Sequence, residues 1–483
     1  MGQPIVQSLW YGQAVRLADS RERSSQIRRS GYDRVSVADG HVPVAPSCRS
    51  ELQLYIRLSA LMFLAYMPAG AVVPLFALHL KQLNISPALV GWIFATQAAG
   101  PILAPLIAGQ LADRYLSADR CLRYFALIAA GLLWLLADCT EPLPIFMVFL
   151  GFWVVMMPSL TLTTTLCLTH LPNVERQFGR ARLWGTVGWI IPSWLMGWWL
   201  SVSHSAQLND AIRFGSLLCL ALAAYTLTLP AAPPRGATTG SGSGSGSRFA
   251  PLAAFRAVRS QAFTVYVVCL WGVCTTIPFT VQLTPLLLNA LELPPSLLVM
   301  ALTLSQATEV LALALLPWLL EHLGLRRTMV LGLVAWSLAF AVLTTGNPLW
   351  LVVGSLAFNG FCIGCFVVAG QVFVNRRATA DTRASMQSLI SCVSGTGLLS
   401  GSLLVGYLRH ATATDFALSF AVGLGLVVSC LVLFTLCFQL DGQPAPINRL
   451  WQRLRRRLRR ATAASAASAP TGPPSAAQSA QPR

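Results

Sequence analysis

The apolar segment GRARLWGTVGW, residues 179 to 189, contains an arginine, a threonine and a tryptophan at helical spacing. Arg182, Thr186 and Trp189 follow the pattern i, i+4, i+7, so in a helix their side chains share one face. That face offers a guanidinium fork, a hydroxyl and an indole ring. Such a set suits a polar ligand with a flat or apolar side, held by hydrogen bonds and by stacking. We expect these three residues to bind substrate.

Two glycines and a second arginine lie in the same segment. Gly185 and Gly188 allow the backbone of a neighbouring helix to approach closely. Arg180 lies nearer the end of the helix and fits a cytoplasmic anchor. The alternative for Arg182 is the same anchoring role, with Trp189 packed between helices. Its position inside the apolar core favours a functional role.

A second candidate site is the single acid in the apolar run ALTLSQATEVLALALLPW. Glu309 is this acid, and Gln306 lies about one helical turn before it. A charged carboxylate near the bilayer centre costs at least about 2.5 kcal/mol, so we expect Glu309 to face a cavity. A group that can be neutral or charged near neutral pH is what proton coupling requires. The alternative is a structural ion pair, with Arg182 as the partner.

The elements that position these residues are predicted to be transmembrane helices. Hydrophobic residues make up 55% of the 483 residues and charged residues only 11%, which is more apolar surface than a soluble core can bury. The apolar runs are continuous and reach the length of about 20 residues that spans a bilayer, without the alternation of a membrane barrel. We predict an all-α membrane protein with twelve spans. Their approximate bounds are 56–78, 88–112, 121–138, 144–168, 183–202, 212–230, 262–288, 295–320, 328–345, 349–374, 384–408 and 415–438.

A Pro- and Gly/Ser-rich run at 231–258 divides these spans six and six, and we expect it to be a flexible cytoplasmic linker. Residues 51–230 and 259–440 then form two six-helix halves, the plan of a major facilitator transporter with its site between the halves. We expect residues 1–50 to be a disordered cytoplasmic arm. Residues 441–483 begin with the basic stretch RLWQRLRRRLRR, which suits anionic lipid headgroups, and end in a disordered tail.

The net charge of +17 is unevenly distributed over the connections between spans. The connections on the side of the termini hold Arg114, Arg120, Arg123, Arg176, Arg180, Arg235, Arg248, Arg256, Arg259, Arg326, Arg327, Arg376, Arg377 and Arg383. The loops on the other side hold Lys81, Arg213 and Arg409. This is the positive-inside bias, which predicts that both termini are cytoplasmic. The charge therefore does not indicate nucleic-acid binding.

The residue pattern does not favour an enzyme, a metal or a cofactor. Cys362 and Cys365 form CIGC, which has redox spacing, but they lie inside an apolar run where a thiol packs as a small hydrophobe. The six histidines show no paired spacing for a metal. The sequence contains neither a phosphate-binding glycine loop nor a nucleophile elbow. A membrane-embedded enzyme or a sensor is the weakest alternative.

The segments RLWGTVGW, LADRYLSADR, SQATEVLALALLPWLLEHLGLRRTMVLGLVAWSLAFA and GQVFVNRRATADTRASMQSL resemble the nucleoside:proton symporter family of the major facilitator superfamily. The resemblance extends from about residue 55 to 438. It implies proton-coupled nucleoside uptake by alternating access, in a monomeric multi-pass protein of the bacterial inner membrane. It also implies that Gln306 and Glu309 serve substrate and proton, with Glu309 as the proton-coupling residue.

Two parts of the resemblance extend to other facilitators. The element GQLADR is shared widely and implies a cytoplasmic gate at Gly109, Asp113 and Arg114. The pattern FGRARLWGTVGW is also similar to the lactose permease branch, where the arginine and tryptophan at these positions engage sugar. An oligosaccharide:proton symporter, or an exporter of amphipathic compounds, is therefore the alternative function.

The chain departs from the family pattern in two helices. The family has an aspartate in the tenth helix where FCIGCFVV offers Gly364, so coupling would depend on Glu309 alone. In the seventh helix, VCTTIPFTVQL does not clearly match the family's Gln and Asn ligands. Thr275, Thr276 and Gln282 can substitute for them, and we take Thr276 and Gln282 as candidate substrate ligands.

Overall fold

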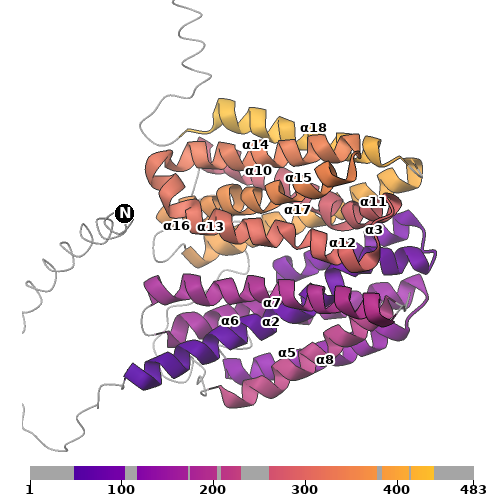
Figure 1. Ribbon diagram of the computed structural model, residues 1–483. Helices are drawn as coiled ribbons and strands as arrows, with labels where there is room; N and C mark the ends of the chain where they lie inside the picture. Colours follow the sequence, from indigo (N-terminus) through magenta and orange to yellow (C-terminus); the bar gives the residue numbers. More distant parts are fainter. Residues whose placement is uncertain are drawn as a thin grey trace, which may run out of the picture. The chain divides into compact units, whose positions relative to one another are not determined.

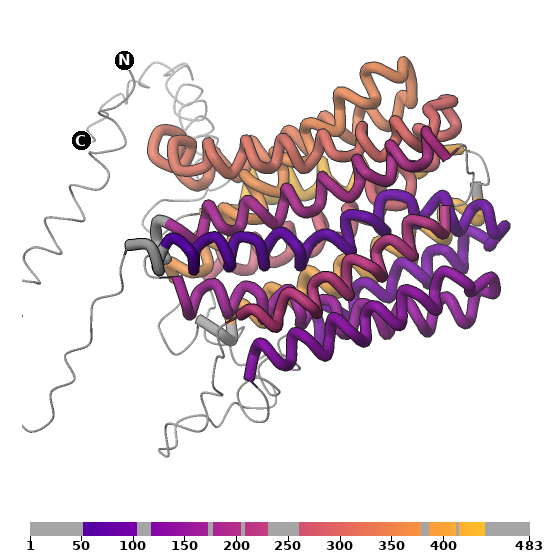
Figure 2. The backbone as a smooth tube through the Cα atoms, turned by 60° about the horizontal axis from the view of Figure 1, so that its bottom comes forward, coloured from indigo at the N-terminus to yellow at the C-terminus, as the bar shows by residue number. Residues whose placement is uncertain are grey.

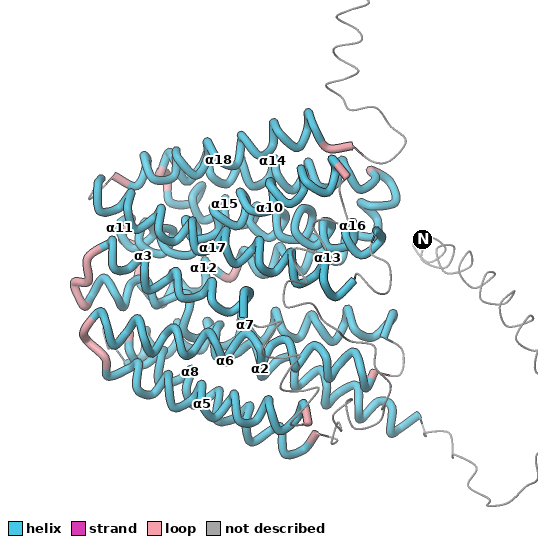
Figure 3. Tube along the Cα trace, turned by 180° about the vertical axis from the view of Figure 1, so that it is seen from behind, coloured by secondary structure: helices cyan, strands magenta, loops and turns pink. Residues whose placement is uncertain are grey.

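The computed structural model describes residues 48–103, 117–171, 174–203, 208–229, 260–377, 383–412 and 415–439. Over these ranges the regular elements are all helices, joined by short loops (Figure 3). The helices that follow Glu51 belong to one unit of the chain, Leu52–Arg483. The predicted all-α class is therefore confirmed.

Most of the N-terminal half lies lowest in Figure 1, in indigo to pink, and its helix α3 lies higher, beside α17 of the C-terminal half. Its helices are α2 (Cys48–Gln82), α3 (Pro87–Ala95) with the 3-10 turn η1 (Thr96–Ala98), α5 (Ala118–Asp138), α6 (Pro142–His170), α7 (Val174–Ser203) and α8 (Asn209–Tyr225) with the 3-10 turn η2 (Thr226–Thr228). Because α2 begins at Cys48, the last residues of the predicted N-terminal arm are helical. The rest of that arm, the linker 231–258 and the tail 441–483 lie outside the described residues.

The C-terminal half contains two helices interrupted by π-helical turns and one broken in two. Its elements are α10 (Gln261–Pro278), η4 (Phe279–Leu283), α11 (Thr284–Ala290), α12 (Pro295–Leu302), α13 (Leu304–His322), α14 (Gly324–Thr345), α15 (Leu349–Cys362), η5 (Ile363–Val368), α16 (Ala369–Arg377), α17 (Arg383–Thr412) and α18 (Phe416–Cys437). The π-helical turns are η4 and η5. Pro278, at the end of α10, cannot donate a backbone hydrogen bond, which explains why the helix changes there.

Ten helices in the described ranges are long and apolar enough to cross a membrane. They match ten of the twelve predicted spans. The other two predicted spans, 88–112 and 183–202, correspond to the shorter apolar helix Pro87–Leu103 and to α7. The full count of twelve stays a prediction.

Local chemistry fixes several helix ends. The side chain of Ser260 caps α10 by accepting a hydrogen bond from the backbone N of Phe263, and Asp415 caps α18 in the same way through Leu418. Gly346 ends α14 in the left-handed conformation, with φ of 67°. Proline occupies the first helical position of α3, α6 and α12, where a backbone N–H would have no acceptor within the helix.

The helix bundle has two ends, which we name after the helix ends that lie there (Figure 2). We call the terminal side the end at which α2 begins and α18 finishes. The distal side is the opposite end, where α2 connects to α3 and α17 connects to α18. The longer helices run between these two sides.

The two halves are in contact on the distal side. A Cβ atom at Gly406 of α17 would lie 2.8 Å from the Cα of Gly91 in α3, so the two backbones touch. The indole Nε1 of Trp194 in α7 donates to the hydroxyl of Thr303, at 2.9 Å. Leu75, Leu78, Met196 and Leu200, from the distal parts of α2 and α7, share a hydrophobic core with the C-terminal half. We call these contacts between the halves the distal gate, and in this structure they are formed.

Candidate functional site

A cavity of about 240 Å³ separates α2 and α7 of one half from α13 of the other. It is lined by Tyr66, Arg182, Gly185, Thr186, Trp189, Gln306 and Glu309. Five of these seven residues are the substrate candidates that the sequence indicates on α7 and α13. We call it the central cavity.

The face of α7 has the geometry that its spacing predicts. Arg182, Thr186 and Trp189 all line the central cavity, whereas Arg180 is exposed, as an anchor would be. The glycines act as expected: a Cβ at Gly188 would lie 2.9 Å from the carbonyl carbon of Phe63 in α2. The close contact between α2 and α7 brings the side chains of α2 beside the arginine.

Tyr66 is a site residue that the sequence pattern does not indicate. The guanidinium carbon of Arg182 lies 4.5 Å from the centre of the Tyr66 ring, within the range of a cation–π interaction. This contact orients the arginine toward the cavity. Tyr66 is one aromatic residue among many in an apolar helix, and only the packing of α2 on α7 singles it out.

Glu309 and Gln306 face the α7 residues across the cavity. Arg182 and Glu309, both in the described part of the chain, form no salt bridge, although Arg182 is close enough to act electrostatically on Glu309 and on Tyr66. The alternative of a structural ion pair is therefore not seen. The side-chain oxygen of Gln306 is buried without a hydrogen-bond partner. Buried polar groups are normally paired, so this oxygen suits a ligand.

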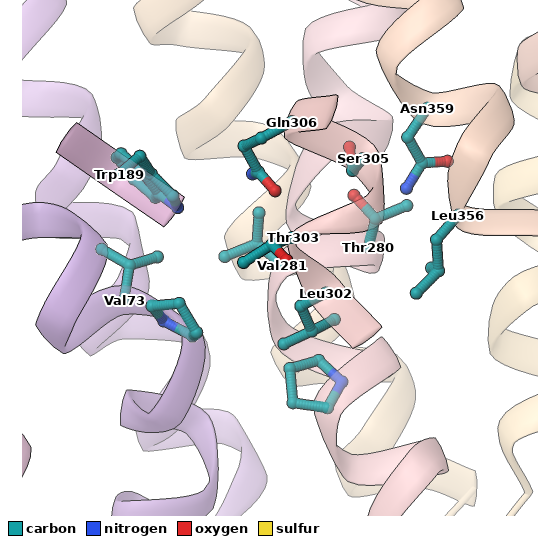
Figure 4. A pocket seen from close by; sticks show the side chains of 12 residues that line it. Val73, Trp189, Thr280, Val281, Leu302, Thr303, Ser305, Gln306, Leu356 and Asn359 are labelled. Carbon is teal, nitrogen blue, oxygen red and sulfur yellow. The ribbon is translucent and has the colours of Figure 1, made fainter. Parts of the chain in front are cut away.

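A second, smaller cavity of about 100 Å³ shares Trp189 and Gln306 with the central cavity. Figure 4 shows Trp189 and Val73 on one side and Thr280, Ser305, Gln306 and Asn359 on the other. Thr280 and Thr303, at the interruptions of α10 and α12, also line it. Interrupted helices near the interface of two halves are typical of transporter sites.

Asn359 of α15 is the second site residue that the sequence pattern does not indicate. It is buried, lines the smaller cavity, and its side-chain oxygen has no hydrogen-bond partner. Together with Gln306 it provides two side-chain amides, which can both donate and accept. A single Asn in an apolar run could have been noticed in the sequence, as Glu309 was.

The tenth-helix position where the family has an acid leaves no room for a side chain. Gly364 lies in the π-helical turn η5 and is buried. A Cβ there would lie 2.7 Å from the Cβ of Ala312 in α13. The helix instead presents Asn359, five residues earlier, to the cavity.

The seventh-helix candidates do not join the central cavity. Thr276 is fully buried, accepts a hydrogen bond from the indole of Trp336 at 2.8 Å, and donates to the carbonyl of Val273. Thr275 donates to the carbonyl of Trp271. Gln282 lines a separate cavity on the distal side. These placements argue against Thr276 and Gln282 as ligands of the same bound molecule. The predicted gate residues Gly109, Asp113 and Arg114 lie outside the described residues.

The known proteins that this chain resembles are membrane transporters. The xanthosine permease of Escherichia coli is 28% identical over 82% of this chain and 99% of its own length. The nucleoside permease NupG of Escherichia coli is 25% identical over 80% of this chain and 96% of its own length. The solved structure of NupG superimposes with a TM-score of 0.70 at 22% identity, over 80% of this chain and all of that one. A D-xylose-proton symporter structure, at 12% identity and a TM-score of 0.63, shares the fold.

A family model described as "Nucleoside H+ symporter" matches residues 52–443. The match covers both helical halves and every residue of the two cavities. The expected family, and with it the major facilitator fold, is confirmed, and the relatives are transporters rather than enzymes. The chain belongs to the nucleoside:proton symporter family.

Proposed function

We propose that this proton-coupled nucleoside transporter binds its substrate in the central cavity and the smaller cavity together, with Glu309 as the proton carrier. One observation carries the proposal: polar residues of α7 and α13, from opposite halves, line one cavity. A solute held between two halves can be released on either side when the halves rock. Residues from one half alone could not couple binding to that motion.

Each group has a chemical role in this proposal. The Arg182 fork donates two parallel hydrogen bonds to ligand oxygens, and the indole of Trp189 stacks on the base. The amides of Gln306 and Asn359 pair with polar edges of the base or the sugar. Thr186 adds a hydroxyl to the same face.

The proton acts by removing charge. When Glu309 is protonated, the loaded carrier moves through the closed intermediate without a charged carboxylate, which is costly in a low-dielectric site. Each proton that moves inward down about 100 mV supplies about 2.3 kcal/mol, enough for a substrate gradient of the order of tens-fold. The family pattern has a second acid, an aspartate in the tenth helix, that could carry the proton. This chain has Gly364 at that position.

The orientation in the membrane is inferred from the charge bias. Arg123, Arg326 and Arg377 lie on the terminal side, where they donate to Thr226, to the carbonyl of Thr435 and to Ser260. We place this side and both termini in the cytoplasm, and the protein in a bacterial inner membrane as a monomer. We therefore take the structure, with its halves in contact on the distal side, as the inward-facing state.

The deciding experiment is uptake of labelled nucleosides into proteoliposomes with an inward proton gradient. Uridine, adenosine and xanthosine should compete, and maltose should not. Uptake that ignores both the gradient and a protonophore would remove proton coupling. Competition by maltose alone would favour the sugar alternative, for which a maltose permease of Geobacillus stearothermophilus, 23% identical, gives some support.

Trp189→Phe should retain substantial transport, and Trp189→Ala should lose most of it. Stacking of a base on an aromatic ring contributes about 1 to 3 kcal/mol in nucleic-acid sites, and phenylalanine keeps part of that. Initial uptake rates of the two variants at equal expression provide the measurement. Equal rates for the two would show that the ring does not touch the substrate.

Gly406→Val should reduce transport strongly by preventing closure of the distal gate. The added side chain would meet the Cα of Gly91 and the backbone oxygens of Pro87 and Ala88. Overpacking costs about 1 to 3 kcal/mol, which opposes the distal-closed state. Gly354→Val on α15 is the matched control, because a Cβ there meets no neighbour within 4 Å. Equal uptake rates for both variants would mean that this contact is not part of the cycle.

A further inference from the structure

A third cavity, of about 330 Å³, lies on the distal side between the two halves. Its walls come from the end of α2 and the start of α3 in one half, and from η4, α11, α17 and α18 in the other. It is lined by Ala77, Lys81, Asn84, Ile85, Ser86, Pro87, Val90, Gln282, Leu283, Leu286, Val405, Gly406, Arg409 and Phe416. We call it the distal cavity.

The charged side chains that line the distal cavity are both basic. Lys81 and Arg409 line it from opposite halves, and its lining, all within the described residues, contains no acid. Asp415 acts on Arg409 electrostatically from outside the lining, while its carboxylate caps α18. The cavity is about ten times the roughly 30 Å³ of a water molecule in the liquid, so it has room for a polyatomic ion.

Two buried polar groups at this cavity are unpaired. The guanidinium Nη1 of Arg409 is buried without a hydrogen-bond partner, although the group stacks on the Phe416 ring at 4.2 Å. Gln282 is 2% exposed; its Nε2 donates to the hydroxyl of Ser402 at 3.2 Å, and its Oε1 has no hydrogen-bond partner.

We propose that the distal cavity is a binding site for a phosphate-type oxyanion. Lys81 and Arg409 supply opposite charge, and the arginine fork matches a tetrahedral oxyanion geometrically. The hydroxyl of Ser86, in the lining, adds a donor. A buried unpaired guanidinium nitrogen is costly, and an anion in the cavity satisfies it.

Because the distal cavity lies between the two halves, a bound anion would affect the transport cycle. Lys81 belongs to the N-terminal half and donates to Asn289 of the other half at 3.5 Å. An anion shared by Lys81 and Arg409 would add a further link between the halves on the same side. Because a ligand stabilises the state that binds it better, the anion favours the distal-closed state.

The test measures thermal unfolding of the purified full-length protein without nucleoside, in nanodiscs of neutral phosphatidylcholine. Inorganic phosphate is titrated against chloride at constant ionic strength. We expect phosphate to raise the unfolding temperature by about 2 to 4 °C. A second arm replaces part of the lipid with phosphatidylglycerol, so that a lipid headgroup and free phosphate can be told apart as sources of the same chemistry.

Three variants define the site, each compared with its own phosphate-free baseline so that altered stability does not confuse the result. Arg409→Gln and Lys81→Gln should remove the phosphate shift. Gln282→Glu keeps the shape of the side chain and should also remove it by adding a negative charge. Arg213→Gln is the control, because Arg213 is a distal-side arginine whose salt bridge with Asp138 lies on the exposed surface.

The outcomes separate clearly. A shift with phosphate or with the anionic lipid that needs Arg409 and survives in Arg213→Gln supports the site and identifies its source. A shift of equal size with chloride, or one that is unchanged in all three variants, overturns the proposal. Neither result depends on nucleoside transport, so the proposed substrate site stands or fails separately.

Discussion

Arg182→Ala is expected to abolish nucleoside binding while the protein stays folded and inserted. The variant loses two charge-assisted hydrogen bonds, each of about 1.5 to 3 kcal/mol, so affinity should fall at least about 100-fold. The helix itself should persist, because alanine is a strong helix former and the contacts of Gly188 with α2 remain. Equilibrium binding of labelled uridine to purified protein provides the measurement.

Two variants sharpen this result. Arg180→Ala is the matched control, since Arg180 lies on the same helix but is exposed, and it should bind nearly as well as the wild type. Arg182→Lys should rescue poorly, because an ammonium keeps the charge and part of the contact with Tyr66 but cannot reproduce the planar fork. Normal binding by Arg182→Ala would show that the residue is only a cytoplasmic anchor.

The α7 site could be predicted because it depends on a local property. The faces of an undisturbed α-helix follow from its period alone, so the shared face of Arg182, Thr186 and Trp189 can be derived without a structure. The same holds for Gln306 and Glu309 on α13. Which face of α2 or α15 meets these residues depends on contacts between helices. This is why Tyr66 could not be predicted, and why Asn359, although noticeable as a single amide in an apolar run, could not be placed beside Gln306.

The substrate candidates that lie outside the central cavity come from the stretch around an irregular turn of a helix. Beyond Pro278 the π-helical turn η4 changes the number of residues per turn, so the period no longer says which residues share a face. Thr280 reaches the smaller cavity, Gln282 reaches the distal cavity, and Thr276 stays within the C-terminal half. Spacing alone could not separate Thr280 from Gln282; Thr276 lies before η4, in the regular part of α10. The second π-helical turn, η5, contains Gly364, the other position at which the family pattern fails.

Glu309→Gln is expected to separate substrate binding from proton coupling. Glutamine keeps the shape and hydrogen-bonding capacity of the neutral acid but cannot ionise, so the variant resembles the permanently protonated carrier. It should bind nucleoside and exchange it across the membrane at equal concentrations. It should not accumulate nucleoside against a gradient, so a wild-type accumulation of the order of tens-fold should fall to about onefold.

The pH dependence of binding provides the second measurement on the same variant. In the wild type, rising pH removes the proton from Glu309 and restores the charge in the cavity, so binding should change with pH. Glu309→Gln cannot lose a proton, so its nucleoside binding should not change with pH. Glu321→Gln, an exposed position on the same helix, is the control and should keep both the pH dependence and the accumulation.

The strength of this test comes from the composition of the site. Among the described residues that line the central and the smaller cavity, Glu309 is the only acid. Gly364 has no room for another, because Ala312 packs against it. A second carboxylate therefore has no place in these cavities from which to take over the proton. Accumulation that survives in Glu309→Gln would mean that the proton crosses outside the two cavities, and Glu309 would then be a substrate ligand without a coupling role.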